Sequence, residues 1–477
     1  MSEQQPRTRQ ELYEQVRNLG REEFILEEMI RYGFWSPQGS IPEDPTDEIR
    51  RAGEIRRELQ ELRQESSRLR NEQYLRKEAL KKRLAESRKK QQETKERREK
   101  ERLERAQAWQ QKKECKIIYL GEEVSTGLNN GEANLERLQN NNLPLCNTAE
   151  EIATAMGITI GKLRFLAFNR KTSSVSHYIR FKMPKKTGGE RFISAPMPNL
   201  KQAQHWILTN ILNKLEFHEA AHGFCQRRSI ITNATPHVGA DVVINFDLKD
   251  FFPSISYKRV KGLFHSFGYS ETAATIFALL CTAADVDKLQ LDGKIYYVAP
   301  GNRYLPQGSP ASPAISNLLC RRLDKRLTVM AEDLGFRYTR YADDLSFSAS
   351  GECLRHICNI LKRVKSIVTH EGLVINQDKT RILRNSRQQE VTGVVVNEKL
   401  SVCRKTLKKF RATLYQIEKE GIEGKSWGNS TNLLAAITGF ANFVTMVNPE
   451  KGKEFQKQVK RIKKKYASKK RVIKSGE

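Results

Sequence analysis

The sequence has no long hydrophobic run and no closely paired cysteines. None of its apolar segments approaches the roughly 18 residues of a membrane-spanning helix, and the N-terminus lacks the apolar stretch of a secretory signal. The eight cysteines are scattered, and no two of them form a CxxC pair. We therefore expect a cytoplasmic protein with reduced thiols, which has no membrane anchor, no disulfides and no structural zinc site.

Proline is absent between residues 50 and 114, and glycine occurs there once, at Gly53. The 23 basic and 13 acidic residues of this segment alternate, as in a solvated helix held by ion pairs four residues apart. The segment also contains the 4-3-4-3 spacing of a coiled-coil seam, at Ile55, Leu59, Leu62, Ser66 and Leu69. We expect a spacer, or an arm for self-association or for an effector protein. Direct contact with nucleic acid remains the alternative.

Acidic residues are too few to balance the basic ones. The 477 residues carry a net charge of +28, and the pI is about 9.7. Such a surplus favours a polyanionic partner, most simply nucleic acid, with an anionic membrane surface as the competing interpretation. Hydrophobic residues make up 38% and charged residues 29%, which indicates a packed core with a charged extension.

Composition also predicts the order of the parts. We expect a small N-terminal helical segment (1–47, with an amphipathic helix over Glu11–Tyr32), a charged coiled coil or long helix (48–118), a linker rich in glycine and asparagine (119–145), an α/β region (146–400) and a helical tail with a basic end (401–477). Thr148 and Glu151 have the spacing of a capping box, which predicts a helix start directly after the linker.

The most informative stretch is YTRYADDLSFS, residues 338–348. Aromatic, apolar and β-branched residues on both sides of Asp343 and Asp344 predict a β-hairpin whose turn presents two carboxylates. Two adjacent aspartates most often mark an exposed polar turn. Strand-rich apolar flanks, however, would leave this pair poorly solvated, so that a cation is needed to neutralise it.

A third acid follows a buried strand. The apolar run over residues 242–246 ends at Asp247, and a carboxylate at that position is costly to bury without a partner. Asp250 lies nearer the turn at Pro253, and we expect it to be solvated. The sequence therefore predicts a cation at Asp247 as well as at the acid pair.

Two further segments carry groups that suit a nucleotide. Residues 181–196 form a strand, a glycine-containing turn and a strand, and bring Lys185, Lys186 and Arg191 onto one hairpin. Such a hairpin suits a triphosphate, although basic hairpins are usually just solvated. In LPQGSPASP, residues 305–313, Gln307 supplies donor and acceptor groups and Gly308 permits close backbone approach.

In this order, the segments resemble a reverse transcriptase. The matching motifs are F-D-x-x-x-F-F from Phe246, L-P-Q-G-S-P-x-S-P from Leu305, R-Y-A-D-D from Arg340 and G-x-x-I-N-x-x-K-T from Gly372. The resemblance spans roughly residues 160–400. NATPH (233–237) and VTG (391–393) further resemble the NAxxH and VTG elements of the retron-type reverse transcriptases of bacteria.

The resemblance implies an α+β right-hand polymerase preceded by the charged helical or coiled-coil arm. Fingers would span 146–240, the palm with fingers insertions 241–400, and the helical thumb with its basic tail 401–477. The implied activity is RNA-directed DNA synthesis on a cognate structured non-coding RNA, primed from the 2′-OH of an internal guanosine. The product would be a branched RNA–DNA hybrid, msDNA, that serves anti-phage defence. No RNase H signature follows the thumb, so we expect a host RNase H to remove the RNA.

The resemblance also assigns residues to a metal site. It implies that two Mg²⁺ ions, about 4 Å apart, are held by Asp247, Asp343, Asp344 and the Leu248 carbonyl. Hard oxygen ligands are those that Mg²⁺ prefers. Asp344 is the less clearly assigned direct ligand.

Other residues would contact the dNTP or the RNA. The resemblance implies dNTP contacts by Lys185 (or Lys186), Arg191, Phe252, Gln307 and Lys379. Phe252 stands where a steric gate would exclude a ribose 2′-OH, with a core aromatic as the alternative. Lys379 matches a lysine proposed as the acid for pyrophosphate. RNA contacts are implied for Asn233, His237, Val391, Thr392 and Gly393, with a structural role of His237 left open.

Two other functions stay open at this point. One is another bacterial reverse transcriptase, of the group II intron-like or abortive-infection type, against which NATPH and VTG argue. The other is a mainly non-catalytic RNA scaffold of a defence complex. Three converging carboxylates argue against that scaffold, because without metal they would only destabilise the fold.

Overall fold

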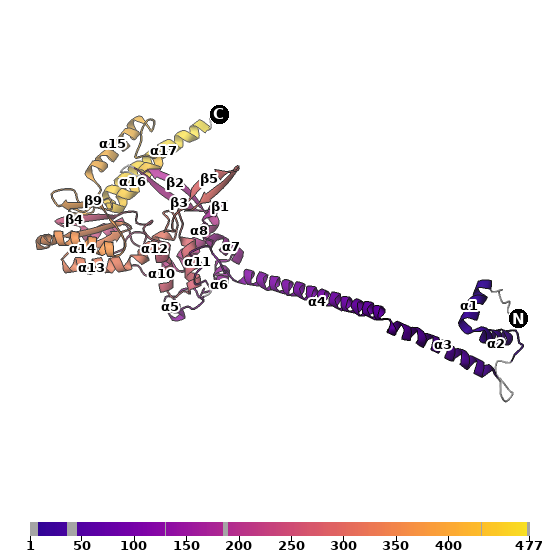
Figure 1. Ribbon diagram of the computed structural model, residues 1–477. Helices are drawn as coiled ribbons and strands as arrows, with labels where there is room; N and C mark the ends of the chain where they lie inside the picture. The colour runs from indigo at the N-terminus through magenta and orange to yellow at the C-terminus, as the bar shows by residue number, and fades with distance from the viewer. Residues whose placement is uncertain (1–7, 36–44, 129, 185–188, 431, 475–477) are drawn as a thin grey trace. The chain divides into compact units, whose positions relative to one another are not determined.

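The structure is a computed structural model that describes residues 8–35, 45–128, 130–184, 189–430 and 432–474. Side chains are described in these ranges except at residues 45, 111–115 and 467–474. The chain forms two compact units, Met1–Trp109 and Gln110–Glu477 (Figure 1). Within the described ranges, no helix is both long and apolar enough to cross a membrane. The seven cysteines with described side chains are all free thiols.

The N-terminal unit is built from helices α1 (Arg9–Leu19), α2 (Arg21–Arg31), α3 (Pro45–Arg70) and α4 (Glu72–Cys115). The single helix predicted over Glu11–Tyr32 is divided at Gly20, whose φ of 86° no right-handed helix contains. A second break at Asn71 separates α3 from α4. There the Asn71 side-chain oxygen accepts a hydrogen bond from the Tyr74 amide at 3.3 Å and caps α4.

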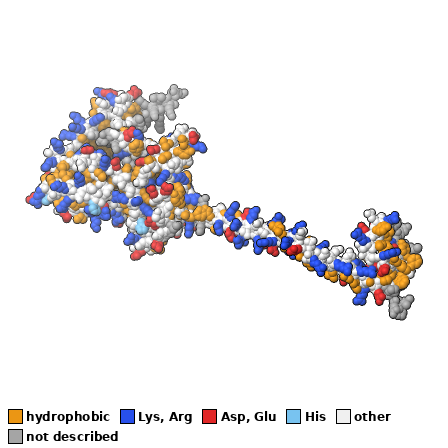
Figure 2. Space-filling model, in the orientation of Figure 1, with side chains coloured by type: hydrophobic (Ala, Val, Ile, Leu, Met, Phe, Trp, Pro, Cys, Tyr) orange, Lys and Arg blue, Asp and Glu red, His pale blue; other side chains and the backbone are white. Residues whose placement is uncertain are grey.

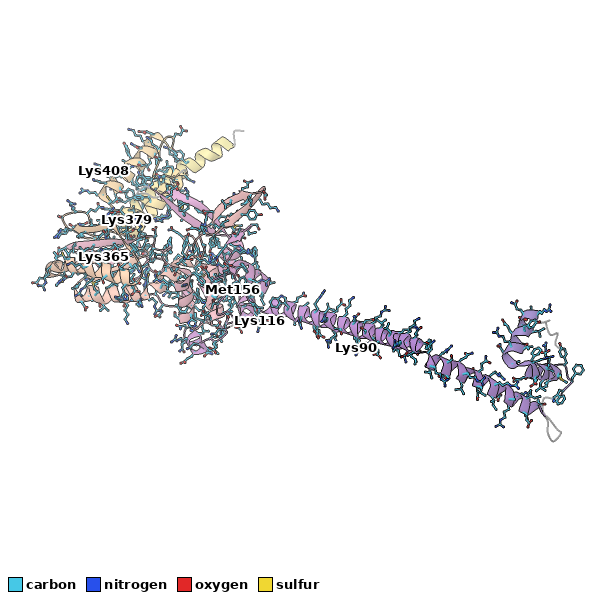
Figure 3. All side chains as sticks on the ribbon, in the orientation of Figure 1. Lys90, Lys116, Met156, Lys365, Lys379 and Lys408 are labelled. Carbon is cyan, nitrogen blue, oxygen red and sulfur yellow. The ribbon has the colours of Figure 1, made fainter. Side chains whose placement is uncertain are left out.

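Helix α4 is solvated over residues 72–110. Figure 2 shows Lys and Arg side chains along the arm interleaved with acidic ones, and Lys90 in Figure 3 lies on this helix. Ion pairs four residues apart join Arg76 to Glu72 at 3.4 Å and Arg97 to Glu101 at 3.9 Å. The predicted ion-paired, solvated helix is confirmed here. Such exposed pairs each add only a few tenths of a kcal/mol, about 0.3–0.5.

The second unit mixes helices and strands. Its helices are α5 (Leu135–Asn140), α6 (Ala149–Met156), α7 (Ile160–Ala167), α8 (Pro198–Asn210), α9 (Ile230–Ala234), α10 (Tyr257–Ser266), α11 (Glu271–Cys281), α12 (Ser312–Leu319), α13 (Arg321–Asp333), α14 (Ile357–His370), α15 (Arg404–Glu420), α16 (Leu433–Val447) and α17 (Pro449–Lys474), with short 3-10 helices η1 (Leu212–Lys214), η2 (Thr235–His237) and η3 (Gly351–His356).

Its strands fall into four antiparallel groups. They are β1 (Thr172–Ser173), β2 (Tyr178–Pro184), β3 (Glu190–Pro196), β4 (Val242–Leu248), β5 (Asp287–Leu291), β6 (Lys294–Val298), β7 (Arg337–Tyr341), β8 (Asp344–Ala349), β9 (Ile375–Arg384), β10 (Glu390–Val391) and β11 (Val394–Val395). The four-stranded central sheet has the order β7-β8-β4-β9. The smaller groups are β1-β6-β5 and the hairpins β2-β3 and β10-β11.

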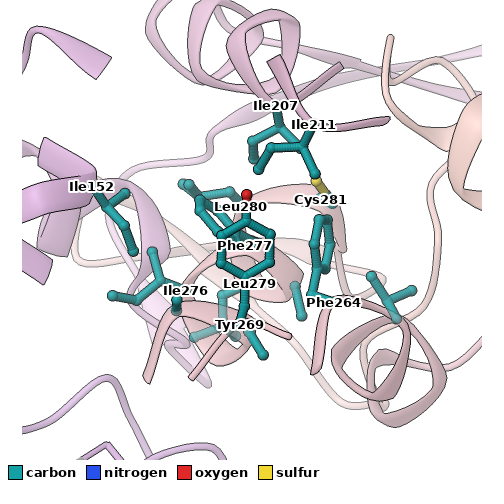
Figure 4. Packing of buried hydrophobic residues seen from close by; sticks show 14 of the residues in the cluster. Ile152, Ile207, Ile211, Phe264, Tyr269, Ile276, Phe277, Leu279, Leu280 and Cys281 are labelled. Atoms are coloured by element: carbon teal, nitrogen blue, oxygen red, sulfur yellow. The ribbon is translucent and has the colours of Figure 1, made fainter. Parts of the chain in front are cut away.

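Helix α11 forms the centre of the first hydrophobic core. All its residues from Thr272 to Cys281 are buried. Figure 4 shows Phe277 of this helix among side chains of α6, α8 and α10, and its ring centroid lies 5.4 Å from that of Phe264. Helix α6 begins at the predicted capping box, which is confirmed, because the Glu151 amide donates to Thr148 Oγ1 at 3.2 Å.

The central sheet has one apolar and one more polar face. Val242, Ile244 and Phe246 of β4 pack on the same side as α13 and α14 (Figure 1). Side chains alternate along a strand, so Asp247 points to the opposite face. Asp344 pairs directly with Asp247 and shares that face. The two carboxylates thus lie where α13 and α14 do not cover the sheet.

The C-terminal helices form the third core. Helix α15 buries one apolar face, which is formed by Leu407, Phe410, Leu414 and Ile417. The apolar segment over residues 433–447 forms α16. This core also takes in Val243 of β4, so the C-terminal helices are anchored to the second face of the central sheet.

A fully buried ion pair lies beneath the end of β7. The Arg340 and Asp324 side chains have no exposed surface, and Nε and Nη2 of Arg340 each donate to a carboxylate oxygen at 2.7 Å. Tyr338 Oη donates to the same carboxylate at 2.9 Å. Burial opposes the charge of Arg340, but Asp324 outweighs that effect and raises the pKa of the guanidinium. Arg340 Nη1 also donates to the Ala342 carbonyl at 3.1 Å, which holds the next turn.

Replacing Asp324 with Asn removes the counter-charge of the buried Arg340. We expect the free energy of unfolding of the second unit to fall by about 3–5 kcal/mol, as when one partner of a buried pair is lost. Chemical denaturation, followed by the fluorescence of Trp206 and Trp427, measures it. Asp333→Asn, exposed on the same helix, is the control and should change stability by about 0.5 kcal/mol at most. Equal effects of the two substitutions would contradict the prediction.

Candidate active site

Two aspartates face each other across neighbouring strands. Asp247 is the penultimate residue of β4, and Asp344 is the first residue of β8 and its direct pairing partner. Asp343 lies beside them, in the turn with Ala342 that joins β7 to β8. The predicted hairpin is therefore confirmed, and the structure brings the three predicted acids to one edge of the central sheet.

The turn between β7 and β8 is fixed by its backbone surroundings. Ala342 has a φ of 57°, which a residue with a Cβ seldom adopts. Gly223 lies against it so closely that an added Cβ would be 2.6 Å from the Ala342 nitrogen. Asn317 Nδ2 donates to the Gly223 carbonyl at 2.8 Å, and Arg340 holds the Ala342 carbonyl. The position of Asp343 thus depends on main-chain contacts as well as on its own side chain.

Lys379 reaches the acids from a bulge in β9. Regular pairing from Asn245 and Arg381 would bring residue 379 opposite Asp247, but Asn376 stands there, so β9 contains three extra residues. Lys379 Nζ lies 2.9 Å from Asp247 Oδ1, and Asn376 Nδ2 donates to Oδ2 at 3.3 Å. Figure 3 labels Lys379 on the central sheet. In this structure, Lys379 is the cation beside Asp247.

Ionisation of the other two acids, Asp343 and Asp344, is electrostatically unfavourable. Loss of contact with water, together with the charges of Asp343 and Asp247, raises the pKa of Asp344 to about 7. Asp344 is nevertheless exposed to solvent, and screening by water weakens this effect. Burial, and then the charge of Asp247, raise the pKa of Asp343, while Arg191 and Lys379 act in the opposite direction. A further positive charge at this edge would relieve the repulsion.

The donor set suits a divalent cation in kind. Three carboxylates on adjoining strands and a turn are hard oxygen ligands. Among the described residues, however, no three His, Cys, Asp or Glu side chains converge in the manner of a metal cluster. The Asp247 carboxylate is bonded to Lys379 and Asn376 instead. Metal binding would require Asp247 to turn from Lys379 toward the other two acids.

The residues predicted to grip the triphosphate lie on hairpin β2-β3. Arg191 is exposed on β3, and its charge lowers the pKa of Asp343, so it acts on the acid site. Lys185 and Lys186 fall outside the described residues. The hairpin is tied to the LPQGSP loop, because the Ser194 amide donates to the Gln307 carbonyl at 2.8 Å.

Two more residues predicted to contact the nucleotide border the same region. Gly308 has a φ of 118°, and an added Cβ would lie 2.8 Å from the Ser194 carbonyl oxygen, so Gln307 is held against the hairpin. Phe252 is half-buried and packs against both the first core and the core of the central sheet. Its ring centroid lies 5.4 Å from that of Phe251. Both alternatives for Phe252, core residue and gate, therefore remain compatible with its position.

The residues predicted to contact RNA are mostly inside the protein. His237 is fully buried, with Nδ1 2.7 Å from Ser348 Oγ and Nε2 2.7 Å from Thr339 Oγ1. Burial lowers the pKa of His237 to about 3, so the ring is neutral at pH 7. This arrangement matches the structural role left open for His237, and the side chain could reach RNA only if the surrounding core opened.

The first residue of the VTG segment is buried, and the other two form a turn at the surface. Val391 is buried in the third core, whereas Thr392 and Gly393 form the two-residue turn of hairpin β10-β11, with φ values of 48° and 85°. Asn233 is fully buried, and its Nδ2 donates to Thr392 Oγ1 at 3.4 Å. The structure thus brings NATPH and VTG together, and their accessible residues include Thr235 and the Thr392–Gly393 turn.

Several residues that shape the site were not foreseen. Asn376 contacts Asp247, Gly223 supports the turn, and Asp324 neutralises Arg340. Asp324 left a signal, since it interrupts the apolar side of an amphipathic helix over residues 321–333. Asn376 also left one, because it is the asparagine of the motif that begins at Gly372. The contacts of Asn376 and Gly223 depend on segments far apart in the chain.

The raised pKa of Asp344 makes the stability of the metal-free protein depend on pH. Between the ordinary value of 3.8 and about 7, the folded chain holds a proton that the unfolded chain has lost, so wild-type stability falls as pH rises. Asp344→Asn should match the wild type near pH 4 and become the more stable protein by pH 8. Chemical denaturation in a chelating buffer measures this difference. A difference that stays constant with pH would contradict the raised pKa.

Comparison with known proteins finds relatives of this chain. The family model described as "Reverse transcriptase (RNA-dependent DNA polymerase)" matches residues 183–396. The retron Mx162 reverse transcriptase of Myxococcus xanthus is 43% identical over 340 residues, which cover 68% of this chain and 69% of the relative. The retron Ec86 reverse transcriptase of Escherichia coli is 34% identical over 334 residues, which cover 70% and 95% of the two chains.

A telomerase from Candida albicans in complex with a telomeric RNA fragment is a more distant structural neighbour. It has a TM-score of 0.36 and 14% identity, and the match covers 60% of this chain and 56% of that one. The family model and the retron relatives confirm the predicted α+β right-hand polymerase class, preceded by the N-terminal helices. Reverse transcriptases generally use divalent metal ions, which the three carboxylates fit in kind. The chain therefore belongs to the retron reverse transcriptases, which are RNA-directed DNA polymerases of bacteria.

Proposed function

We propose that this polymerase binds a cognate structured non-coding RNA, primes from the 2′-OH of an internal guanosine and synthesises branched msDNA for anti-phage defence. The observation that supports the polymerase site is the pairing of Asp247 with Asp344 across β4 and β8, with Asp343 beside them. Membership of the retron family supports the choice of RNA and product.

Asp247, Asp343 and Asp344, with the Leu248 carbonyl, are the groups that would hold two Mg²⁺ ions. When bound, the ions would offset the repulsion among the carboxylates, lower the pKa of the primer hydroxyl and stabilise the charge of the leaving pyrophosphate. The backbone fixes the turn that carries Asp343, because Gly223 and Arg340 hold Ala342. Lys379, once separated from Asp247, would present an ammonium group that can protonate the pyrophosphate.

The incoming dNTP would lie between hairpin β2-β3 and the acids. Arg191 supplies positive charge that already acts on Asp343, and we assign Lys185 or Lys186 to the same triphosphate. Gln307 would contact the nucleotide from the loop tied to Ser194. Phe252, half-buried beside the site, would exclude a ribose 2′-OH and so favour dNTPs.

The RNA would be recognised by shape at the VTG turn and the C-terminal helices. Thr392 and Gly393 form an accessible turn, and Asn233 donates to Thr392 from inside the protein. Helix α15 adds exposed basic side chains, such as Lys408 in Figure 3. Contact with phosphates by such residues gives affinity, and the position of the turn gives selectivity for a stem-loop.

We further assign the regions of the hand by their cores. Residues 146–240 would form the fingers, residues 241–400 the palm with fingers insertions, and residues 401–477 the thumb with its basic tail. The first core joins α6–α8 to α10–α12, which agrees with insertions of the palm sequence into the fingers. A host RNase H would remove the copied RNA, and the protein would act in the cytoplasm.

The double substitution Asp343→Asn, Asp344→Asn tests the catalytic assignment. We expect DNA synthesis on the co-purified RNA to fall about 100-fold or more, as when a group that stabilises transition-state charge is lost. RNA binding should stay close to that of the wild type, because the RNA contacts lie elsewhere. Asp250→Asn, an exposed acid three residues after Asp247, is the control and should keep activity. Branched msDNA made by the double variant would refute the assignment.

Phe252→Ala tests the gate. Removing the ring should raise ribonucleotide incorporation relative to deoxyribonucleotide incorporation about 10- to 100-fold, the range for a single lost steric contact. Primer extension with each nucleotide type measures the ratio. Phe252→Tyr keeps the ring and should keep the discrimination. If the ratio is the same in Phe252→Ala as in the wild type, Phe252 is only a core residue.

A further inference from the structure

We propose that two copies of this chain associate through α3 in a parallel, in-register coiled coil. This association goes beyond the polymerase function and uses none of the active-site residues. Three features of the N-terminal unit support it. The apolar seam of α3 is exposed, the head formed by α1 and α2 packs on the other side of α3, and the charges beside the seam complement those of a second copy.

The apolar seam of α3 is open to solvent. Ile55, Leu62 and Leu69 occupy the d positions of a heptad, and Leu59 an a position. Their exposed fractions are 50%, 62%, 59% and 46% in that order. Four large apolar side chains in one line at coiled-coil spacing are costly to leave in water. A partner helix with the same spacing would cover them.

Helix α2 packs against the side of α3 away from the seam. Thr46 and Gly53 are buried there, and Arg57 Nη2 lies 2.8 Å from Glu23 Oε1 of α2. An added Cβ at Gly53 would collide with the Glu23 carboxylate, so the two helices are in close contact. In the heptad of the seam, residues 46 and 53 are b positions and residue 57 is an f position, which belong to the outer face. The head therefore leaves the four apolar seam residues, Ile55, Leu59, Leu62 and Leu69, exposed.

The flanking charges match a parallel partner. Glu58 and Glu65 occupy g positions, and Arg63 and Arg70 occupy e positions. In a parallel dimer, each g residue lies beside the e residue five positions later in the other chain, so Glu58 meets Arg63 and Glu65 meets Arg70. All four side chains are exposed, and no ion pair found within the described residues uses any of them. Two-fold symmetry makes each contact twice.

The same charges disfavour an antiparallel pair. In that orientation g faces g and e faces e, which would set Glu58 and Glu65 against each other and Arg63 against Arg70. One like-charge contact remains in the parallel pair, between Arg51 and Arg56 at its N-terminal end. Glu22 of the chain's own head lies 3.8 Å from Arg56 and offsets it.

The pairing is confined to α3. The helix ends at Arg70, and residues 86–102 of α4 contain no apolar side chain that could continue the seam. Because the seam is little more than two heptads long, the dimer should form with modest affinity and depend on protein concentration. Two polymerase units would then belong to one assembly.

The mass of the full-length protein in solution tests the association. Light scattering is measured over a range of concentrations after nuclease treatment, so that RNA cannot join two chains. The wild type should rise from the 54.9 kDa of one chain toward twice that mass. Leu59→Glu with Leu62→Glu should remain at 54.9 kDa, whereas the outer-face control Gln64→Glu should behave as the wild type. A wild type that stays at one chain's mass, or seam variants that still associate, would overturn the proposal.

Charge exchange and cross-linking test the pairing and its orientation. Glu58→Arg with Glu65→Arg, and Arg63→Glu with Arg70→Glu, should each be monomeric alone and associate when mixed. Leu69→Cys should form a disulfide-linked dimer under oxidation, because a parallel pair brings the two copies of residue 69 together, whereas Ser67→Cys on the outer face should not. No association in the mixture, or equal cross-linking at both positions, would overturn the parallel arrangement.

All α3 variants should keep the primer-extension activity of the wild type. This readout separates the two proposals, because a loss of DNA synthesis in the active-site variants and a loss of association in the α3 variants are measured independently. A seam variant that lost both would instead indicate misfolding. The charge-exchanged pair, whose association returns on mixing, then decides the question, since misfolded chains would not regain it.

Discussion

Repulsion among three carboxylates at one edge of the central sheet is the constraint on which the second unit depends. Antiparallel pairing puts Asp247 opposite Asp344, and a turn held by Gly223 adds Asp343. The fold tolerates this because Lys379 neutralises Asp247 and because the supporting ion pair of Arg340 is itself fully compensated. A site built in this way is stable as a protein and still favours additional cations, which is what nucleotidyl transfer with divalent metals requires.

Local sequence patterns predicted the elements whose cause is local. The hairpin around the acid pair, the capping box at Thr148 and helix α16 follow from alternation, capping chemistry and an apolar run. The hairpin β5-β6 was missed, although Asp292 and Gly293 between alternating residues are a strong turn signal. The bulge of β9 and the support of Ala342 could not be predicted, because both depend on pairing between segments more than 100 residues apart.

Motifs identified the family better than they identified contacts. NATPH marked a retron enzyme, yet the structure buries His237 and Asn233, whose hydrogen bonds tie the sheet to the VTG turn. The sequence motifs mark the contact between the NATPH and VTG segments, but only the burial of each residue shows which atoms are accessible to RNA. The N-terminal helices give a second example of this difference between sequence pattern and structure. The spacing and charge of the arm residues predicted helices, but only the packing of α2 on α3 reveals which face remains for a partner.

The central claim is that the three carboxylates act together once Asp247 leaves Lys379. An experimental structure of the chain with its RNA, a dNTP and Mg²⁺ tests this most directly. The account predicts that oxygens of Asp247, Asp343 and Asp344 surround the metal and that the 2.9 Å contact between Asp247 and Lys379 is broken. A loaded complex in which Asp247 keeps that contact, with the metal held by other groups, would contradict it.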